Sequence, residues 1–354
     1  MEALVWLGTE QLELRDLPVP EPAAGEAIVR VRYTGICGTD LHIFHGKHPR
    51  AKPPLVMGHE FCGHIARPGA GREDLREGDF VVGEPLISCG VCDACVRGYR
   101  HVCQKLGLYG IDRDGAFAEY LRIPAAKLLR VPCALTPEKT ALVEPAAVAV
   151  HALRLSAIRS GDTVCVLGAG PMGLLTALVA RDSGAQRVLI CEREPMRIGL
   201  ARDFGLEAIN VDEVDPMEAI MEATSGRGAD VVFEAAGSAS SSLLAPKACR
   251  VRGQIVLIAM PKSPVPMDLV TITFRELALV GVRVYEPYDF ERAMSFLAGS
   301  DLDFNALLSR PFPLKDGPTA FAEAGRGGAV MRVLFAPGRP DEGAEGQRGK
   351  RAKP

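Results

Sequence analysis

The chain of 354 residues is 47% hydrophobic and 24% charged, which suits a globular protein that buries two hydrophobic cores of ordinary size. Lysine and arginine total 41 against 44 acidic residues, so the net charge of -3 gives no electrostatic reason to bind nucleic acid or an anionic membrane. The N-terminal segment has no basic stretch ahead of a long apolar run, and we therefore expect a cytoplasmic protein without a signal peptide.

Two patterns divide the chain. Up to about residue 145, short β-rich runs such as residues 27–33 and 80–82 alternate with turns rich in glycine, proline and aspartate, which predicts a mainly β domain. After residue 161, apolar strands alternate with helical segments, which predicts a parallel, doubly wound α/β sheet. The strands of this sheet are expected at residues 163–167, 188–191, 230–233, 255–259 and 277–280.

The end of the chain returns to the first domain. We expect a helix at residues 289–298 and a last strand near residues 330–335, and assign both to that domain. The tail at residues 337–354 is poor in apolar residues, so it cannot offset its ordering entropy and is expected to be disordered. Residues 163–180 carry no charge, but glycines and a proline interrupt them, so we expect a strand, a turn and a helix rather than a membrane span.

A dinucleotide-binding motif follows the first strand of the predicted parallel sheet. Gly168, Gly170 and Gly173 form GxGxxG between this strand and the start of a helix. The first glycine permits a tight turn, the second lets the backbone approach a pyrophosphate, and the third allows close packing of helix on strand. An ordinary glycine-rich turn would explain an isolated match, but it would not explain the strand and helix around the motif or the acid beyond it.

The end of the next strand bears on the choice of cofactor. Glu192 lies 19 residues after Gly173, where a carboxylate can accept hydrogen bonds from the adenosine ribose hydroxyls and repel a 2'-phosphate. We therefore predict NAD and take Glu192 and Arg197 as cofactor-binding residues. The neighbouring Arg193 offers a positive charge for a 2'-phosphate, which leaves NADP as the alternative.

The cysteines predict a structural metal site. Ten cysteines in a chain without an export signal point to reduced thiols, and clustered thiols then favour metal binding over disulfides. Cys89, Cys92, Cys95 and Cys103 follow C-x2-C-x2-C-x7-C, a spacing that lets four thiolates close around one tetrahedral Zn2+ and leave no position for a substrate. An iron–sulfur cluster is the competing interpretation.

A second set of ligands is spread over the first domain. Cys37 lies in a Gly-Ile-Cys-Gly-Thr-Asp-Leu-His segment, His59 follows about twenty residues later, and Glu144 comes just before the nucleotide-binding half. Three ligands around Zn2+ leave a position open, which is the catalytic arrangement that binds an alcohol and lowers its pKa. Taken singly, each would be an ordinary core residue, a satisfied histidine or a solvated carboxylate, so only the set predicts a site.

In this order, the motifs resemble the zinc-containing medium-chain dehydrogenases. The similarity runs from the N-terminal strand to about residue 336 and includes segments at residues 35–42, 58–63, 89–103, 115–120 and 144–151 besides the GxGxxG unit. The family implies a GroES-like, mainly β catalytic domain and a Rossmann domain, with an active-site cleft between them. The implied bounds are 1–146 and 286–336 for the catalytic domain, 89–103 for its cysteine lobe and 147–285 for the Rossmann domain.

The resemblance implies metal ligands. By it, Cys37 and His59 bind the catalytic zinc, and Glu60 and Glu144 are carboxylates that bind this zinc directly or reach it through water. We take Glu144 as the third ligand and Glu60 as the alternate. With the four-cysteine lobe, this gives two zinc ions per chain.

The resemblance also implies a proton relay and a reaction. Thr39 matches the hydroxyl that contacts the alcohol on zinc, and His42 matches the imidazole that passes its proton through the cofactor ribose to solvent. Without the family, both would be ordinary loop residues. Glutamate at the position of Glu144 places the chain with polyol and threonine dehydrogenases, and the Ala-Ala-Val-Ala-Val-His run at residues 146–151 resembles the sorbitol and polyol branch more than the threonine branch.

We therefore predict interconversion of a secondary alcohol of a polyol, cyclitol or sugar derivative with its ketone, dependent on NAD and zinc. The partner is a small-molecule alcohol, and a homodimer or homotetramer is expected. L-Threonine 3-dehydrogenase and butanediol dehydrogenase are alternatives within the enzyme class. A catalytically idle nucleotide-binding relative is the alternative of another class, and the intact set of ligand and relay residues argues against it.

Overall fold

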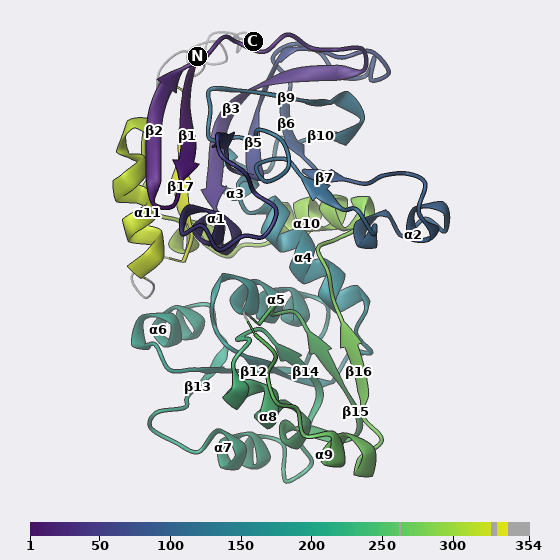
Figure 1. Cartoon of the computed structure of the whole chain (residues 1–354). Helices are drawn as coiled ribbons and strands as arrows, with labels where there is room; N and C mark the ends of the chain where they lie inside the picture. The colour runs from purple at the N-terminus through teal and green to yellow at the C-terminus, as the bar shows by residue number, and fades with distance from the viewer. Residues whose placement is uncertain (262, 327–330, 339–354) are drawn as a thin grey trace, which may run out of the picture.

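The computed structural model describes residues 1–261, 263–326 and 331–338. Figure 1 shows two bodies: the upper one is built by the two ends of the chain and the lower one by its middle. The upper body contains antiparallel sheets and the lower body contains one parallel sheet, so the fold class predicted from the sequence is confirmed. Of the tail that we expected to be disordered, residues 339–354 lie outside the described residues.

The first body is organised around β3 (Glu26–Ile36), which pairs antiparallel with β5, β9 and β17. The sheet has the order β10-β6-β5-β3-β17, with β9 also beside β3. A second sheet has the order β2-β1-β4, and the pair β7 and β8 flanks the cysteine lobe. The other strands are β1 (Glu2–Gly8), β2 (Gln11–Asp16), β4 (Leu55–Val56), β5 (Glu60–Arg67), β6 (Phe80–Gly83), β7 (Leu86–Ile87), β8 (Gly107–Leu108), β9 (Tyr120–Pro124), β10 (Leu128–Arg130) and β17 (Val333–Phe335).

The second body is a six-stranded parallel sheet of order β13-β12-β11-β14-β15-β16, the doubly wound order of dinucleotide-binding domains. Its strands are β11 (Thr163–Leu167), β12 (Arg187–Glu192), β13 (Glu207–Asn210), β14 (Ala229–Glu234), β15 (Cys249–Leu257) and β16 (Ala278–Gly281). Five of them lie where the apolar runs predicted strands. The sixth, β13, was not predicted, because this short edge strand has no continuous apolar run and is only partly buried.

Alternate residues of β11 enter different cores, as expected of a strand covered on both faces. Val164 and Val166 belong to the core that includes helices α4 and α5, whereas Cys165 and Leu167 belong to the core under α7 and α8. The uncharged stretch after residue 163 is therefore a strand, a turn and helix α5, as predicted. No helix among the described residues is long and apolar enough to cross a membrane.

Two helices, α4 and α10, lie between the bodies (Figure 1). The domain boundary that we expected between residues 146 and 147 falls inside α4. The helices of the described chain are α1 (Gly38–Phe44), α2 (Asp93–Val96), α3 (Pro137–Thr140), α4 (Val143–Arg154), α5 (Pro171–Asp182), α6 (Pro195–Asp203), α7 (Pro216–Ala223), α8 (Ala239–Ala248), α9 (Leu269–Phe274), α10 (Pro287–Gly299) and α11 (Gly317–Arg326), with 3-10 turns η1 (Arg100–Val102), η2 (Ala125–Lys127), η3 (Phe304–Leu307) and η4 (Leu314–Asp316).

Candidate active site

Helix α1 presents Cys37 at its N-terminus. Cys37 is the N-cap residue, in extended conformation, and the Asp40 carboxylate accepts a hydrogen bond from the Cys37 backbone N–H at 2.8 Å, as in a capping box. Asp40 also accepts from the Gly58 N–H at 3.3 Å and lies 3.7 Å from Nδ1 of His59. One buried acid thus holds together the two segments that carry the predicted ligands Cys37 and His59.

The ligand atoms of Cys37, His59 and Glu60 lie within 4.8 Å of one another, and we call these three residues the donor group. Glu144 does not belong to this group, although we expected it as the third ligand and Glu60 as the alternate. Glu60 is the first residue of β5 and directly follows His59, whereas Glu144 lies on helix α4 and its carboxylate falls outside this group.

Glu60 is held from two sides. Its Oε1 accepts a hydrogen bond from Nη1 of Arg332 at 2.7 Å, and both side chains are buried. Gly35 lies opposite Glu60 in the β3–β5 register, and a Cβ atom at Gly35 would come within 2.4 Å of Glu60 Oε2. Glycine therefore leaves the space that this carboxylate occupies. Glu60 Oε2 is buried and has no hydrogen-bond partner.

Glu144 faces a different neighbour. It is buried in the first turn of α4, near the hydroxyl of Tyr285, which is completely buried and makes no hydrogen bond within the described residues. Burial, reinforced by the nearby negative charge of Glu60, raises the pKa of Glu144 to about 7. The Glu60 carboxylate is thus close enough to oppose the ionisation of Glu144.

The charges around the donor group fit a divalent cation. Asp40, Glu60 and Glu144 are buried beside the half-buried thiol of Cys37, and Arg332 is the one guanidinium that interacts with them among the described residues. Burial raises the pKa of Asp40, and although burial alone lowers the pKa of His59, the Asp40 carboxylate raises it well above the usual range. His59 Nδ1 and Glu60 Oε2 are both buried without a hydrogen-bond partner. A metal ion would supply the missing positive charge and satisfy these atoms.

The predicted relay residues lie on α1 rather than on a loop. The Oγ1 atom of Thr39 is 3.9 Å from the Sγ atom of Cys37, so this hydroxyl borders the donor group. His42 is half-buried in the last turn of the same helix. Because residues three apart on a helix are neighbours on its surface, Thr39 and His42 share one side of α1.

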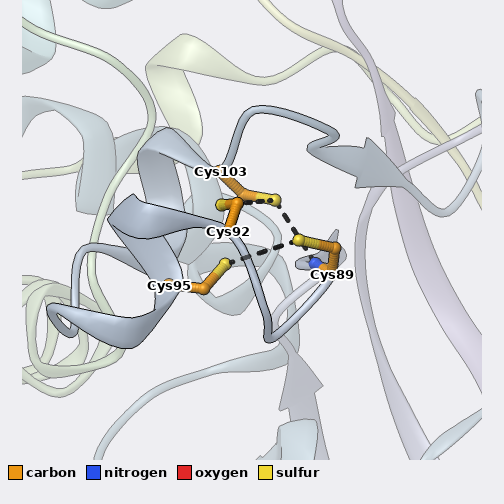
Figure 2. A group of neighbouring side chains, drawn as sticks. All are labelled: Cys89, Cys92, Cys95 and Cys103. Carbon is orange, nitrogen blue, oxygen red and sulfur yellow. Dashed lines mark hydrogen bonds between the residues drawn. The ribbon is translucent and has the colours of Figure 1, made fainter.

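The four cysteines of the lobe converge on a single point (Figure 2). Cys89 Sγ is 4.0 Å from Cys95 Sγ, and Cys92 Sγ is 3.9 Å from Cys103 Sγ. Four ligands at about 2.3 Å from one ion in a tetrahedron would lie about 3.8 Å apart. The spacing therefore matches one shared ion, whereas a four-iron cluster would spread the sulfurs over separate irons.

Backbone amides of the lobe favour thiolates. The N–H groups of Cys89 and Lys105 point at the Sγ atom of Cys103, each at 3.3 Å. Hydrogen bonds from the N–H groups of Gln104 and Cys95 lower the pKa of Cys92 to about 6. Thiolates are the form that binds metal, so these amides favour the metal-binding form of Cys92, whereas burial and the neighbouring thiols raise the pKa of Cys95 to about 11.

The three glycines of the nucleotide motif have different surroundings. Gly168 has φ +100, which favours glycine, and a Cβ at Gly173 would lie 1.8 Å from the carbonyl oxygen of Gly168. At Gly170, by contrast, the nearest atom to such a Cβ is Nη1 of Arg197 at 3.9 Å. The fold itself therefore requires glycine at the first and third positions, while the second leaves open space at the N-cap of α5.

Glu192 is anchored by the backbone at the end of β12. Its Oε2 accepts from the Ala169 N–H at 2.8 Å, and its Oε1 accepts from the N–H groups of Arg193 and Glu194 at 2.8 and 3.1 Å. Arg197 Nη1 is 3.7 Å from Oε2. A carboxylate has about four acceptor positions, so Glu192 retains capacity for a ligand hydroxyl beside Gly170. Arg193 instead pairs with Asp212 at 2.9 Å.

Three residues of the site were not found from the sequence. Asp40 lies inside the predicted segment, and an acid three residues after the N-cap was the signal that could have revealed it. Arg332 and Tyr285 are more than a hundred residues from their partners Glu60 and Glu144, and no local pattern marks them. Long-range packing alone brings them to the site.

Comparison with known proteins covers both bodies. Residues 23–133 match the alcohol dehydrogenase GroES-like domain, and residues 171–299 match the zinc-binding dehydrogenase family. The 2-dehydro-3-deoxy-L-galactonate 5-dehydrogenase of Pseudoalteromonas atlantica is 36% identical over 94% of this chain and 98% of its own length. The L-threonine 3-dehydrogenase of Pyrococcus horikoshii is 35% identical over 91% of this chain and 94% of its own.

A solved structure has the same fold throughout. The zinc-binding dehydrogenase of Sinorhizobium meliloti 1021, bound to NADP, is 33% identical and superposes with a TM-score of 0.89 over 95% of this chain and 99% of its own. Both sequence and fold are therefore shared along nearly the whole length. The chain belongs to the zinc-containing medium-chain dehydrogenases and is a zinc-dependent alcohol oxidoreductase that uses a nicotinamide cofactor.

Proposed function

We propose that the chain interconverts a secondary alcohol of a polyol, cyclitol or sugar derivative with its ketone, with NAD as the cofactor. The observation that carries this proposal is the buried, acidic donor group of Cys37, His59 and Glu60 with the Thr39 hydroxyl at its border. An idle nucleotide-binding relative would have no need to keep a ligand set and a hydroxyl together in one buried place.

In this proposal the donor group holds the catalytic metal and α1 handles the proton. Zinc supplies Lewis acidity that makes an alcohol easier to deprotonate, and the nicotinamide accepts the hydride. The Thr39 hydroxyl would accept the proton of the substrate alcohol and donate its own toward His42, whose imidazole would release it to solvent. Asp40 and Arg332 hold His59 and Glu60 in place.

A second zinc in the lobe completes the proposed metal content. The four thiols at Cys89, Cys92, Cys95 and Cys103 fill all corners of a tetrahedron, so this ion has no place for a substrate and stabilises the fold instead. Metal analysis of the purified protein checks the count of two. A single zinc, or iron in the lobe, would contradict it.

The names of two relatives support a secondary alcohol as the substrate. The names of the two relatives put the reacting carbon at position 5 of a sugar acid and at position 3 of L-threonine, and each of these carbons lies inside its chain. Threonine is the second candidate, because a threonine dehydrogenase is 35% identical over nearly the whole length. The run at residues 146–151 favours the polyol branch over it.

NAD is proposed because Glu192 lies, with spare acceptor capacity, beside the open position at Gly170. Its negative charge would repel a 2'-phosphate, and the nearby Arg193 is engaged by Asp212. One solved relative binds NADP, so the two cofactors have to be compared directly.

A substrate panel with both cofactors tests the proposed function. Polyols, inositols, sugar acids, butanediol and L-threonine are each assayed with NAD and NADP, and kcat/KM is compared for wild type and Glu192→Ala. We expect the highest value for a polyol or sugar derivative with NAD, and a smaller preference for NAD in the variant. L-Threonine as the best substrate would overturn the polyol assignment, and an unchanged cofactor ratio would overturn the role of Glu192.

We also propose that the chain forms a homo-oligomer through the edge of the parallel sheet. Strand β16 is the end strand of that sheet, and Leu279 on it is exposed. Helix α9 nearby exposes Leu269, Val270 and Phe274, the last with 85% of its surface accessible. An unpaired strand edge next to apolar side chains is a surface that a second copy can cover.

A further inference from the structure

A buried network of charged side chains ties α10 to α4 outside the site described above. Nδ1 of His151 lies 2.7 Å from Oδ2 of Asp289, and Nε of Arg154 donates to Oδ1 of Asp289 at 2.8 Å. Asp289 is completely buried and His151 almost completely. Burial opposes the ionisation of Asp289, but the hydrogen bonds from His151 and Arg154 hold its pKa at about 2. The carboxylate is therefore a fixed charge between the two helices.

One end of this network reaches the cysteine lobe. His101 lies in η1, two residues before Cys103, and its Nδ1 is 3.5 Å from Oε1 of Glu286. The rings of His101 and His151 meet edge to face, with centroids 4.9 Å apart. Glu286 is the N-cap of α10, and Arg154 donates to it at 2.5 Å. The lobe thus contacts the start of α10 and the last turns of α4 at the same place.

The other end reaches the active site. Tyr285 directly precedes Glu286, and its buried hydroxyl lies near Glu144, although it makes no hydrogen bond within the described residues. Glu144 and His151 are seven residues apart on α4, which places them on the same face of the helix, about 10 Å apart along its axis. Residues 285–289 therefore contact α4 at two points, one beside the donor group and one beside the lobe.

We propose that His101, His151 and Asp289 form a brace through which the cysteine lobe positions Glu144 beside the donor group. The proposal rests on the proposed function, because Glu144 has this role only if the donor group holds zinc. The three residues are positioning residues, since they act through Tyr285 and helix α4. Removing the Asp289 carboxylate leaves Arg154 and His151 without their buried partner, and removing His101 removes its ring contact with His151. Either change lets the start of α10 and Tyr285 shift and changes the surroundings of the metal.

Zinc release from the holoenzyme to a chromogenic chelator tests the brace. The time course of zinc release from wild type is compared with that from Cys37→Ser. This variant lacks the metal of the donor group, so the release phase that is absent from its time course belongs to that metal. Asp289→Asn and His101→Leu should each accelerate this phase on the order of tenfold, while the lobe keeps its zinc. His151→Asn, which keeps a donor toward Asp289, should release zinc more slowly than His151→Leu.

A matched control separates positioning from plain loss of stability. Asp230, near the start of β14, pairs with Arg250 at 2.5 Å in a partly exposed ion pair, and Asp230→Asn makes the same substitution there. We expect this control to lower Tm without changing zinc release. Wild-type release in Asp289→Asn, or equal acceleration in Asp230→Asn, would overturn the brace alone. Identical time courses for wild type and Cys37→Ser would show that the donor group holds no zinc, which overturns the proposed function with it.

Discussion

The two glutamates near the donor group have different roles at the residue scale. Glu60 belongs to the group and has a buried oxygen without a partner, whereas Glu144 lies outside the group and interacts with Tyr285. Glu60→Gln should therefore weaken zinc binding by at least about 10- to 100-fold, the effect of losing even an outer partner of a ligand. Glu144→Gln should have the smaller effect on zinc affinity and should release zinc on the order of tenfold faster, as loss of the brace does. Chelator competition, with zinc content measured on each variant, checks both. Loss of zinc only in Glu144→Gln would restore Glu144 as the third ligand.

Thr39 and His42 act in series in the proposed relay, and replacing each of them should lower kcat by a different factor. Thr39→Ala removes the hydroxyl at the border of the donor group and should lower kcat by about 10²- to 10⁴-fold. His42→Ala can be bypassed by water and should cost about 10- to 100-fold. Because the alcohol loses a proton, oxidation by wild type should rise with pH. A pH profile of kcat for the three proteins is the measurement, and an unchanged profile in His42→Ala would mean that the proton leaves by another route.

Site residues that belong to short motifs could be predicted from the sequence, whereas contacts between distant parts of the chain could not. Cys37, His59 and the four cysteines of the lobe could be predicted because each belongs to a short motif with ligand spacing. The third ligand could not be decided, since both Glu60 and Glu144 follow plausible motifs and only the fold shows which one reaches the donor group. Arg332 lies 272 residues from Glu60, so its contact is visible only in three dimensions.

At the scale of elements, two glycines in the turn between β11 and α5 have separate roles, one in folding and one in cofactor binding. A Cβ at Gly173 would meet the Gly168 carbonyl at 1.8 Å, whereas a Cβ at Gly170 has room. Gly173→Ala should therefore lower stability by roughly 1–3 kcal/mol, as overpacking does. Gly170→Ala should keep the wild-type Tm and raise the Kd for NAD, because the added methyl occupies the space of the pyrophosphate. Thermal unfolding and cofactor titration of both variants test this contrast, and normal NAD affinity in Gly170→Ala would contradict it.

The elements were predictable where a periodic pattern is long. Five strands of the parallel sheet have continuous apolar runs, and each of them lies close to its predicted position. Strand β13 was missed because its four residues, Glu-Ala-Ile-Asn, contain no continuous apolar run, and α1 was taken for a loop because its seven residues make fewer than two full turns of amphipathic pattern. Short elements depend on tertiary contacts, which no local pattern contains.

At the scale of the whole molecule, the exposed apolar surface at β16 and α9 predicts self-association. Phe274→Asp places a charge in that surface and should shift the protein to a smaller species at the same concentration. Val214→Asp is the control, because Val214 is also exposed but follows β13 at the opposite edge of the sheet. Light scattering after size-exclusion chromatography gives the mass of each. Equal masses for wild type and Phe274→Asp would place the interface elsewhere or exclude one.

Because β17 pairs with β3, the two bodies can complete their folding only in a fixed order during synthesis on the ribosome. The nucleotide-binding body is continuous in sequence, so it can fold as soon as its last strand has emerged. The catalytic body is first to be translated and last to be complete, because β17 and the guanidinium of Arg332 are supplied by residues 331–335. Until then β3 has an open edge and the Glu60 carboxylate lacks its buried counter-charge. The catalytic body therefore stays incomplete until the nucleotide-binding body and β17 have been synthesised.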